Sequence, residues 1–240
     1  MLAGCNKPLM MSMGTAPMPV YHEPRWSGEQ DKKFVISADA FVGPYGTGQN
    51  VREVLSLGGD LSVMYRFMNP MFVHASFAGV AGDLKYGCSD IPCTREYTNW
   101  KNSQEKDTYW ALQERVLLGT DFVIAGIIQT GFGGGVQFFQ ADGQYEDKRK
   151  EAEELDLVDN ANGKNEIYPV IGYWFGFNLG RNGRHGVIKN EVIVALSNDL
   201  PQNGVMTGGS TYYHPSGFHG GISYSAQMGF VFQLGKSFGF

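Results

Sequence analysis

Apolar and polar residues alternate along much of the chain, and the final segment shows the pattern most clearly. Between residues 227 and 240, apolar side chains fall on one face of an extended segment and polar residues or glycines fall on the other. A period of two is typical of a strand whose two faces meet unlike surroundings. The apolar face consists of Phe230, Phe232, Leu234, Phe238 and Phe240. We therefore expect a strand here.

Seven earlier segments show the same alternation, so the sequence predicts an all-β chain of eight antiparallel strands. Short connections follow the second, fourth and sixth strands, and the other connections are longer. This asymmetry is typical of an up-and-down barrel, and an even strand count places both termini at the short-turn end. The predicted strands cover about 34–42, 55–67, 71–77, 115–124, 128–138, 167–178, 188–196 and 227–240.

The composition favours a transmembrane barrel over a soluble one. The longest apolar run, residues 122–128, is far shorter than the ~20 residues of a membrane-spanning helix. A lipocalin-like barrel or a β-sandwich would also alternate, but its polar face would carry more charge. Here the polar face is rich in glycine, of which the chain has 33, and aromatic residues gather near the predicted strand ends. We therefore expect the apolar face to meet lipid.

The last strand carries a motif of its own. Gly235, Phe238 and the final Phe240 form a pattern that resembles the C-terminal assembly signal of bacterial outer-membrane β-barrels. Residues 33–240 as a whole resemble the eight-stranded OmpA, OmpX and OmpW kind. The resemblance implies a bacterial outer-membrane location with both termini in the periplasm. It also implies a monomer that contacts the barrel assembly machinery, outer-membrane lipids and lipopolysaccharide.

The beginning of the chain suggests a separate tether. Leu2-Ala3-Gly4-Cys5 resembles the lipobox of bacterial lipoproteins, which implies acylation of Cys5; a chance match of four residues is the alternative. The rest of residues 1–32 contains several prolines and no alternation, so it has little means of building a core. We expect a flexible periplasmic tether over 1–32 and the barrel over 33–240.

The remaining cysteines are Cys88 and Cys93, in the polar stretch after the third predicted strand. An oxidising compartment favours a disulfide between them, and two free thiols are the alternative. Metal sites usually need four ligands, and no second cysteine pair exists, so we expect no metal and no cofactor. A net charge of −5 argues against a nucleic-acid partner.

Charged residues on the inward face define the candidate site. Eight strands leave an interior that side chains can fill, and a lone charge there would be costly unless paired. We expect these charges to form a network that closes the lumen, which predicts an anchoring, structural or surface-interaction role with at most a narrow passage. A small-solute porin is an alternative. The expected network is Asp39, Asp60, Arg66, Arg115, Asp121, Lys189 and Glu191.

An enzyme is the other alternative. Lipid A deacylases are outer-membrane barrels with a His-x-Ser motif near the outer rim, and His214-Pro215-Ser216 has that spacing. A serine nucleophile needs a base and an orienting carboxylate, yet residues 200–240 contain no Asp or Glu. The sequence therefore favours a non-enzymatic barrel. Opposite charges at helical spacing after residue 146 could form a short helix above it.

Overall fold

A computed structural model describes most of the chain, and its fold is a closed antiparallel β-barrel. Cys5, Cys88 and Cys93 lie outside the described residues, so the expected acylation and disulfide stay predictions. The described residues are 9–10, 18, 22–26, 32–43, 51–86, 94–104, 107–160, 165–196, 204–225 and 229–240.

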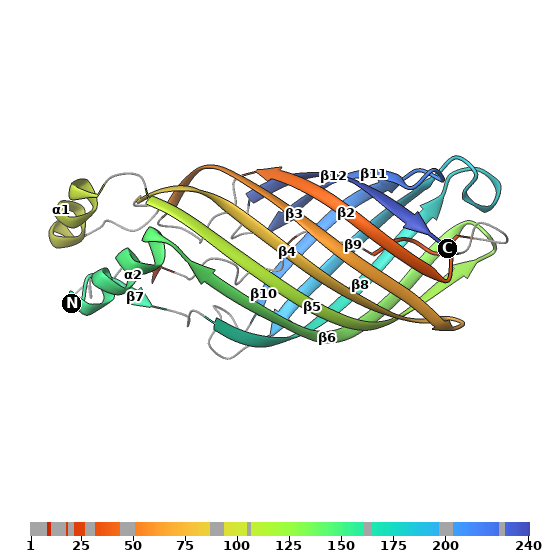
Figure 1. The fold of residues 1–240 in the computed structure, drawn as a ribbon, viewed down its shortest axis with the longest axis horizontal. Helices are drawn as coiled ribbons and strands as arrows, with labels where there is room; N and C mark the ends of the chain where they lie inside the picture. Colours follow the sequence, from red (N-terminus) through yellow and green to blue (C-terminus); the bar gives the residue numbers. More distant parts are fainter. Residues whose placement is uncertain are drawn as a thin grey trace, which may run out of the picture.

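Ten strands form the barrel, in the order β10-β11-β12-β2-β3-β4-β5-β6-β8-β9, and pairing of β9 with β10 closes it (Figure 1). Every neighbouring pair is antiparallel, and β12 pairs with β2 near the C-terminus. The strands are β2 (Phe34–Gly43), β3 (Val51–Met68), β4 (Met71–Tyr86), β5 (Asp107–Ile124), β6 (Ile128–Asp142), β8 (Asn165–Asn178), β9 (Val187–Leu196), β10 (Gly204–Tyr213), β11 (Phe218–Ser225) and β12 (Gly229–Gly239).

The prediction of eight strands is therefore wrong, and β10 and β11 are the two that it misses. Both strands contain a glycine pair, at 208–209 and at 220–221, which interrupts the apolar alternation. The glycines fit the close approach of the two strands. A Cβ on Gly221 would lie 2.6 Å from the carbonyl oxygen of Ser210 on β10. Close backbone packing requires glycine at these positions, and glycine has no side chain that could show the alternation of a strand.

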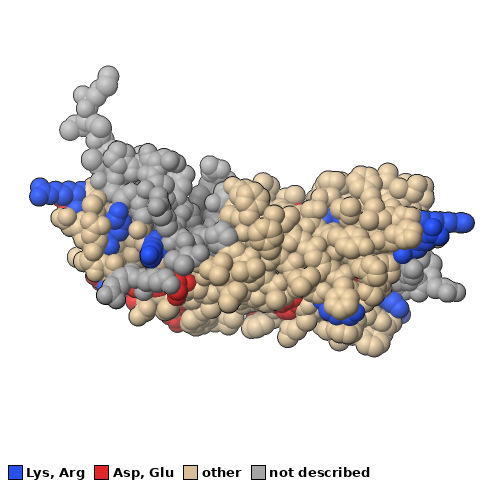
Figure 2. Space-filling view, turned by 90° about the horizontal axis from the view of Figure 1, so that it is seen from above, with Lys and Arg blue, Asp and Glu red and all other residues tan. Residues whose placement is uncertain are grey.

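The outer wall of the barrel is apolar, as the alternation predicts. Outward side chains such as Leu61, Phe132 and Leu234 are 60–69% exposed, although a soluble protein rarely shows a large continuous apolar surface. Figure 2 shows few charges on the middle of the barrel, while Lys and Arg gather at its two ends. An apolar band between charged ends matches the outside of a transmembrane barrel.

The connections differ at the two ends. At one end, which we call the short-turn end, the strands are joined by residues 69–70, 125–127, 179–186 and 214–217, and the 3₁₀ turn Arg181–Gly183 lies there. At the opposite, long-loop end are the helices α1 (Arg95–Ser103) and α2 (Gln144–Glu154). α2 includes the stretch after residue 146 in which the opposite charges allowed a short helix.

The two helices are held above the barrel by aromatic contacts. Thr94 caps α1 by accepting a hydrogen bond from the backbone N–H of Tyr97 at 3.1 Å. Trp100 Nε1 donates to Glu151 of α2 at 3.3 Å, and the Trp100 ring lies edge-on to Tyr86 of β4. Burial raises the pKa of Tyr97 to about 12.

Leu9 and Met10, the first residues that the structure describes, lie at the end opposite to Phe240. The short strand β1 (Leu9–Met10) pairs in parallel with β7 (Asp159–Asn160), which follows α2 at the long-loop end (Figure 1). Phe240 hydrogen-bonds to Phe34 at the short-turn end. Phe34 and Phe240, the two ends of the barrel itself, thus meet at the short-turn end, and the expected periplasmic location of both termini stays a prediction.

Candidate functional site

Met18 and residues 22–26 of the N-terminal segment lie inside the barrel. Met18 donates its backbone N–H to Gln113 Oε1, in the middle of β5, at 2.8 Å. His22 lies further toward the short-turn end than Met18. Trp26 packs with Val187 and Tyr213 close to that end. Met18, His22 and Trp26 are each at most 4% exposed. We call Met18 and His22–Trp26 the lumen segment.

Side chains of the barrel wall hold the backbone of this segment. Lys189 Nζ and Tyr213 Oη both donate to the carbonyl oxygen of His22, at 2.9 and 3.2 Å. Arg66 donates to the carbonyl of Glu23 at 3.2 Å, and Gln129 donates to the carbonyl of Arg25 at 2.7 Å. Buried backbone carbonyls need such partners. Because the donors come from β3, β6, β9 and β10, they hold the segment from several sides. The tether expected over 1–32 is thus bound in the lumen where the structure describes residues 18 and 22–26.

The His22 ring is enclosed by aromatic and charged groups. It stacks on Phe72 with ring centroids 4.7 Å apart and meets the edge of Trp174 at 4.3 Å. Its Nε2 lies 3.3 Å from Asp121 Oδ1, and its Nδ1 lies 3.3 Å from Glu191 Oε2. A single side chain of the lumen segment therefore contacts four strands of the wall.

Four of the seven predicted network residues meet around His22. Arg66 Nη1 lies 2.8 Å from Asp121 Oδ2, and Lys189 Nζ lies 3.2 Å from Glu191 Oε2. Two positive and two negative side chains of the wall thus pair beside the His22 ring. Trp174 Nε1 also donates to Asp121 at 2.5 Å. Ion pairing of this kind reduces the penalty that lone buried ions would pay.

Glycines in the wall make room for the large rings of this cluster. A Cβ on Gly131 would lie 2.3 Å from Trp174 Nε1, and one on Gly119 would lie 2.6 Å from the Phe72 ring. Gly133 also approaches the Trp174 ring. The glycine-rich inward face therefore forms a cradle for Phe72 and Trp174.

Of the other predicted charges, Asp39 and Asp60 form a second group, and Arg115 interacts electrostatically with Glu191 of the first group and with Asp60 of the second. Asp39 accepts hydrogen bonds from His219 at 2.6 Å and from Gln233 at 2.7 Å. Asp60 lies directly opposite Asp39 on the neighbouring strand, and Arg115 is buried on the inward face of β5. The structure thus brings the predicted residues into at least two groups, and closure of the lumen by them stays a prediction.

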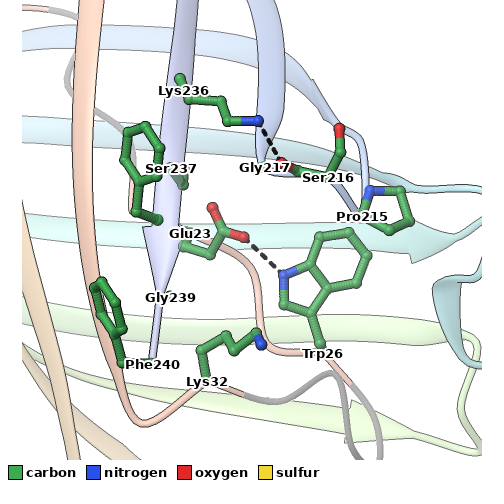
Figure 3. A pocket seen from close by; sticks show the side chains of 11 residues that line it. Glu23, Trp26, Lys32, Pro215, Ser216, Gly217, Lys236, Ser237, Gly239 and Phe240 are labelled. Atoms are coloured by element: carbon green, nitrogen blue, oxygen red, sulfur yellow. Dashed lines mark hydrogen bonds between the residues drawn. The ribbon is translucent and has the colours of Figure 1, made fainter.

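A cavity of about 440 Å³ lies where the lumen segment leaves the barrel (Figure 3). Glu23 and Trp26 form one wall, joined by a hydrogen bond of 2.7 Å. Lys236 forms the opposite side and donates to the carbonyl of Ser216 at 2.6 Å. Both bonds are drawn in Figure 3. Phe240 also lines this cavity, while Phe238 and Phe240 are 53% and 75% exposed. Their role with Gly235 in an assembly signal stays a prediction.

The His214 and Ser216 pair lies at the short-turn end. His214 Nδ1 and Ser216 Oγ are 2.7 Å apart, in the exposed turn between β10 and β11. The deacylase resemblance would place this motif at the outer rim, the end of the long loops. Among the described residues, no group of three or more His, Cys, Asp and Glu is arranged to hold a metal.

Several residues of the site were missed by the sequence analysis. His219 and Gln233 hold Asp39, but β11 was not predicted, so His219 had no assigned face. Trp174 alternates with Gly172 and Gly176 on the inward face, and this position was the available signal. His22 had a weaker signal: His22-Glu23-Pro24-Arg25-Trp26 places charged and aromatic residues together within an otherwise featureless segment.

No protein-family model matches the chain, and no curated protein sequence matches it. The fold is similar to solved outer-membrane proteins. OprG from Pseudomonas aeruginosa is 12% identical with a TM-score of 0.40, and the alignment covers 90% of this chain and 99% of OprG. Ail of Yersinia pestis is 12% identical with a TM-score of 0.36, over 86% of this chain and 99% of Ail. The translocator domain of NalP from Neisseria meningitidis is 11% identical with a TM-score of 0.41, over 90% and 91%. Because the similarity is so low, the role of the chain has to be argued from its own residues.

The helices that the structure describes are too short or too polar to cross a bilayer.

Proposed function

We propose that the protein is a bacterial outer-membrane β-barrel whose lumen is closed by its own N-terminal segment, with an anchoring or surface-interaction role. The apolar outer wall supports the membrane location. Ten strands enclose a wider interior than eight, because barrel diameter grows with strand number. The observation that carries closure is the burial of His22 between Phe72, Trp174 and the paired charges.

The contacts of the lumen segment favour a built-in plug over an open porin. A water-filled pore would expose the side chains that line it, whereas Arg66, Asp121, Lys189 and Glu191 bind one another or the segment. Each hydrogen bond to a buried carbonyl is costly to lose. The segment is therefore a fixed part of the barrel under ordinary conditions.

In this proposal the short-turn end faces the periplasm, as in the barrels that the C-terminal strand resembles. The long loops, α1 and α2 then face outward and form the surface available to partners. β1 also lies at the long-loop end.

Planar-bilayer recording tests the plug. We expect the refolded parent protein to pass no steady current. The double variant His22→Ala/Trp26→Ala removes two buried anchors of the segment and should produce discrete ion-conducting steps. The matched control is His214→Ala/Trp100→Ala, which removes the same residue types outside the lumen and should stay closed.

Two results would contradict the proposal. A steady current through the parent would show an open porin. A folded His22→Ala/Trp26→Ala variant that stays closed would show that other residues seal the barrel. Heat-modifiable migration on gels establishes folding in each case.

A further inference from the structure

The rim at the short-turn end carries a strong excess of positive charge. Its basic residues include Arg25, Lys32, Lys33, Arg66, Arg181, Arg184 and Lys236. The four turns at this end contain no Asp or Glu. Glu23 and Asp121, the acidic residues nearest to the basic ones, are at most 6% exposed. An anion approaching this rim therefore meets mainly cations.

A pocket of about 210 Å³ concentrates this charge between the start of β2 and the β3–β4 turn. Four basic residues and no acidic residue line it. Arg25 donates to the side chain of Asn69 and is held in place, whereas the charge of Arg66 is paired with Asp121, so the unpaired positive charge of the pocket comes mainly from the residues at its mouth. Lys32 and Lys33 are exposed and add two charges at the mouth. The basic lining is Arg25, Lys32, Lys33 and Arg66.

The remaining lining of the pocket is apolar and faces outward. Phe67 and Met68 are 42% and 57% exposed, and Met71 completes this side. Phe67 continues the outward row of β3 formed by Leu61, Val63 and Tyr65, which belongs to the apolar band. The pocket therefore joins a cationic inner side to the lipid-facing surface of the barrel.

We propose that this pocket binds the phosphate of an anionic phospholipid in the leaflet beside the short-turn end. Arginine presents planar, paired donors to phosphate oxygens, and lysine adds point charges. The acyl chains would follow the apolar row of β3. This proposal rests on the barrel lying in a bilayer, as proposed above, but not on closure of the lumen.

A soluble phosphate compound shares the headgroup chemistry, but it would leave Phe67, Met68 and Met71 exposed to water. The junction with the apolar band therefore favours a lipid. Each basic residue near an anionic membrane surface contributes about 1 kcal/mol, or roughly fivefold in affinity. Loss of two lysines should then weaken binding by about 25-fold.

Native mass spectrometry of the full chain in detergent micelles tests the site. We expect phosphatidylglycerol to be retained at one site per chain and phosphatidylcholine to be lost at the same collision energy. Lys32→Gln/Lys33→Gln should weaken phosphatidylglycerol binding by about 25-fold. Lys32→Arg/Lys33→Arg keeps the charge and should restore it. The matched control, Arg181→Gln/Arg184→Gln, removes two charges from the same rim outside the pocket and should bind like the parent.

Three results would overturn the proposal. Equal retention of the two lipids would show that the headgroup charge is not recognised. Equal weakening by the lysine variant and the Arg181/Arg184 control would show diffuse attraction to the whole rim. Displacement of phosphatidylglycerol by millimolar glycerol phosphate would assign the pocket to soluble phosphates. Because binding is read without a current, a failure here is distinct from a conducting parent barrel.

Discussion

The two ends of the barrel differ in which charged residues they carry and in how those residues are held. At the short-turn end, the wall and the lumen segment share a buried network around His22, and the surrounding rim is basic. At the long-loop end, α1 and α2 contact each other through Trp100 and Glu151, and acidic residues are common.

This difference separates two kinds of stabilisation. Buried charges at the short-turn end have few alternatives to their present partners, so removing one partner strands another. In α2, the ion pair of Arg149 and Glu146 is also buried, but the pair of Lys148 and Glu151 is about one third to two fifths exposed, and water competes for both of its groups. Substitutions of similar chemistry in the buried cluster and in the exposed Lys148–Glu151 pair should therefore have unequal effects.

The largest effect is expected for Asp121→Asn. This change keeps the side-chain size but leaves Arg66 without its paired carboxylate and weakens the contacts of His22 and Trp174. Breaking a buried pair costs about 3–5 kcal/mol in free energy of unfolding. Urea titration in lipid vesicles measures this loss. Glu151→Gln is the control at the other end and should cost less than about 1 kcal/mol; equal losses would remove the contrast.

Arg115→Ala should have the next largest effect. Arg115 is 1% exposed and faces the interior, where the sequence analysis assigns it to the closing network. Its removal should lower stability in urea titration or let small ions pass in single-channel recording. If both stability and conductance match the parent, Arg115 takes no part in sealing.

Gly131→Val tests the glycine cradle. Even a Cβ at this position would lie 2.0 Å from the carbonyl oxygen of Thr120 and 2.3 Å from Trp174 Nε1. Overpacking of this kind typically costs about 1–3 kcal/mol. Gly134→Val is the control, because a Cβ there has no neighbour closer than 3.6 Å. A well-folded Gly131→Val protein with unchanged stability and Trp fluorescence would show that the cradle is not needed.

The smallest effect is expected from acid at α2. A hydrogen bond from Lys148 lowers the pKa of Glu151, and the same bond raises the pKa of Lys148. The contribution of Glu151 is therefore present above its ordinary pKa of 4.5 and is lost as pH falls through the lower folded value. Hydrogen exchange of α2 against pH measures this loss, and Lys148→Gln should reduce it. A pH response that is unchanged in this variant would exclude the pair as its cause.

The sequence predicted the barrel and its inward charges because both follow from period-two alternation. Asp121 and Glu191, for example, alternate along their strands with apolar residues, which face outward because contact with lipid requires an apolar surface. The strand count was wrong because the glycines of β10 and β11 carry no side chain to show a face. That error hid the lumen segment as well, since an eight-stranded interior has no room for one. His22 binds residues 99 and 167 positions away, and such long-range contacts leave no local pattern.

Crosslinking from inside the barrel tests most directly whether the N-terminal segment occupies the lumen. A photo-crosslinking amino acid in place of Met18, activated in the folded protein, should attach to inward-facing residues of β5 near Gln113, and peptide mass spectrometry would identify them. Attachment to outward-facing residues, to lipid, or to a second copy of the chain would contradict the account.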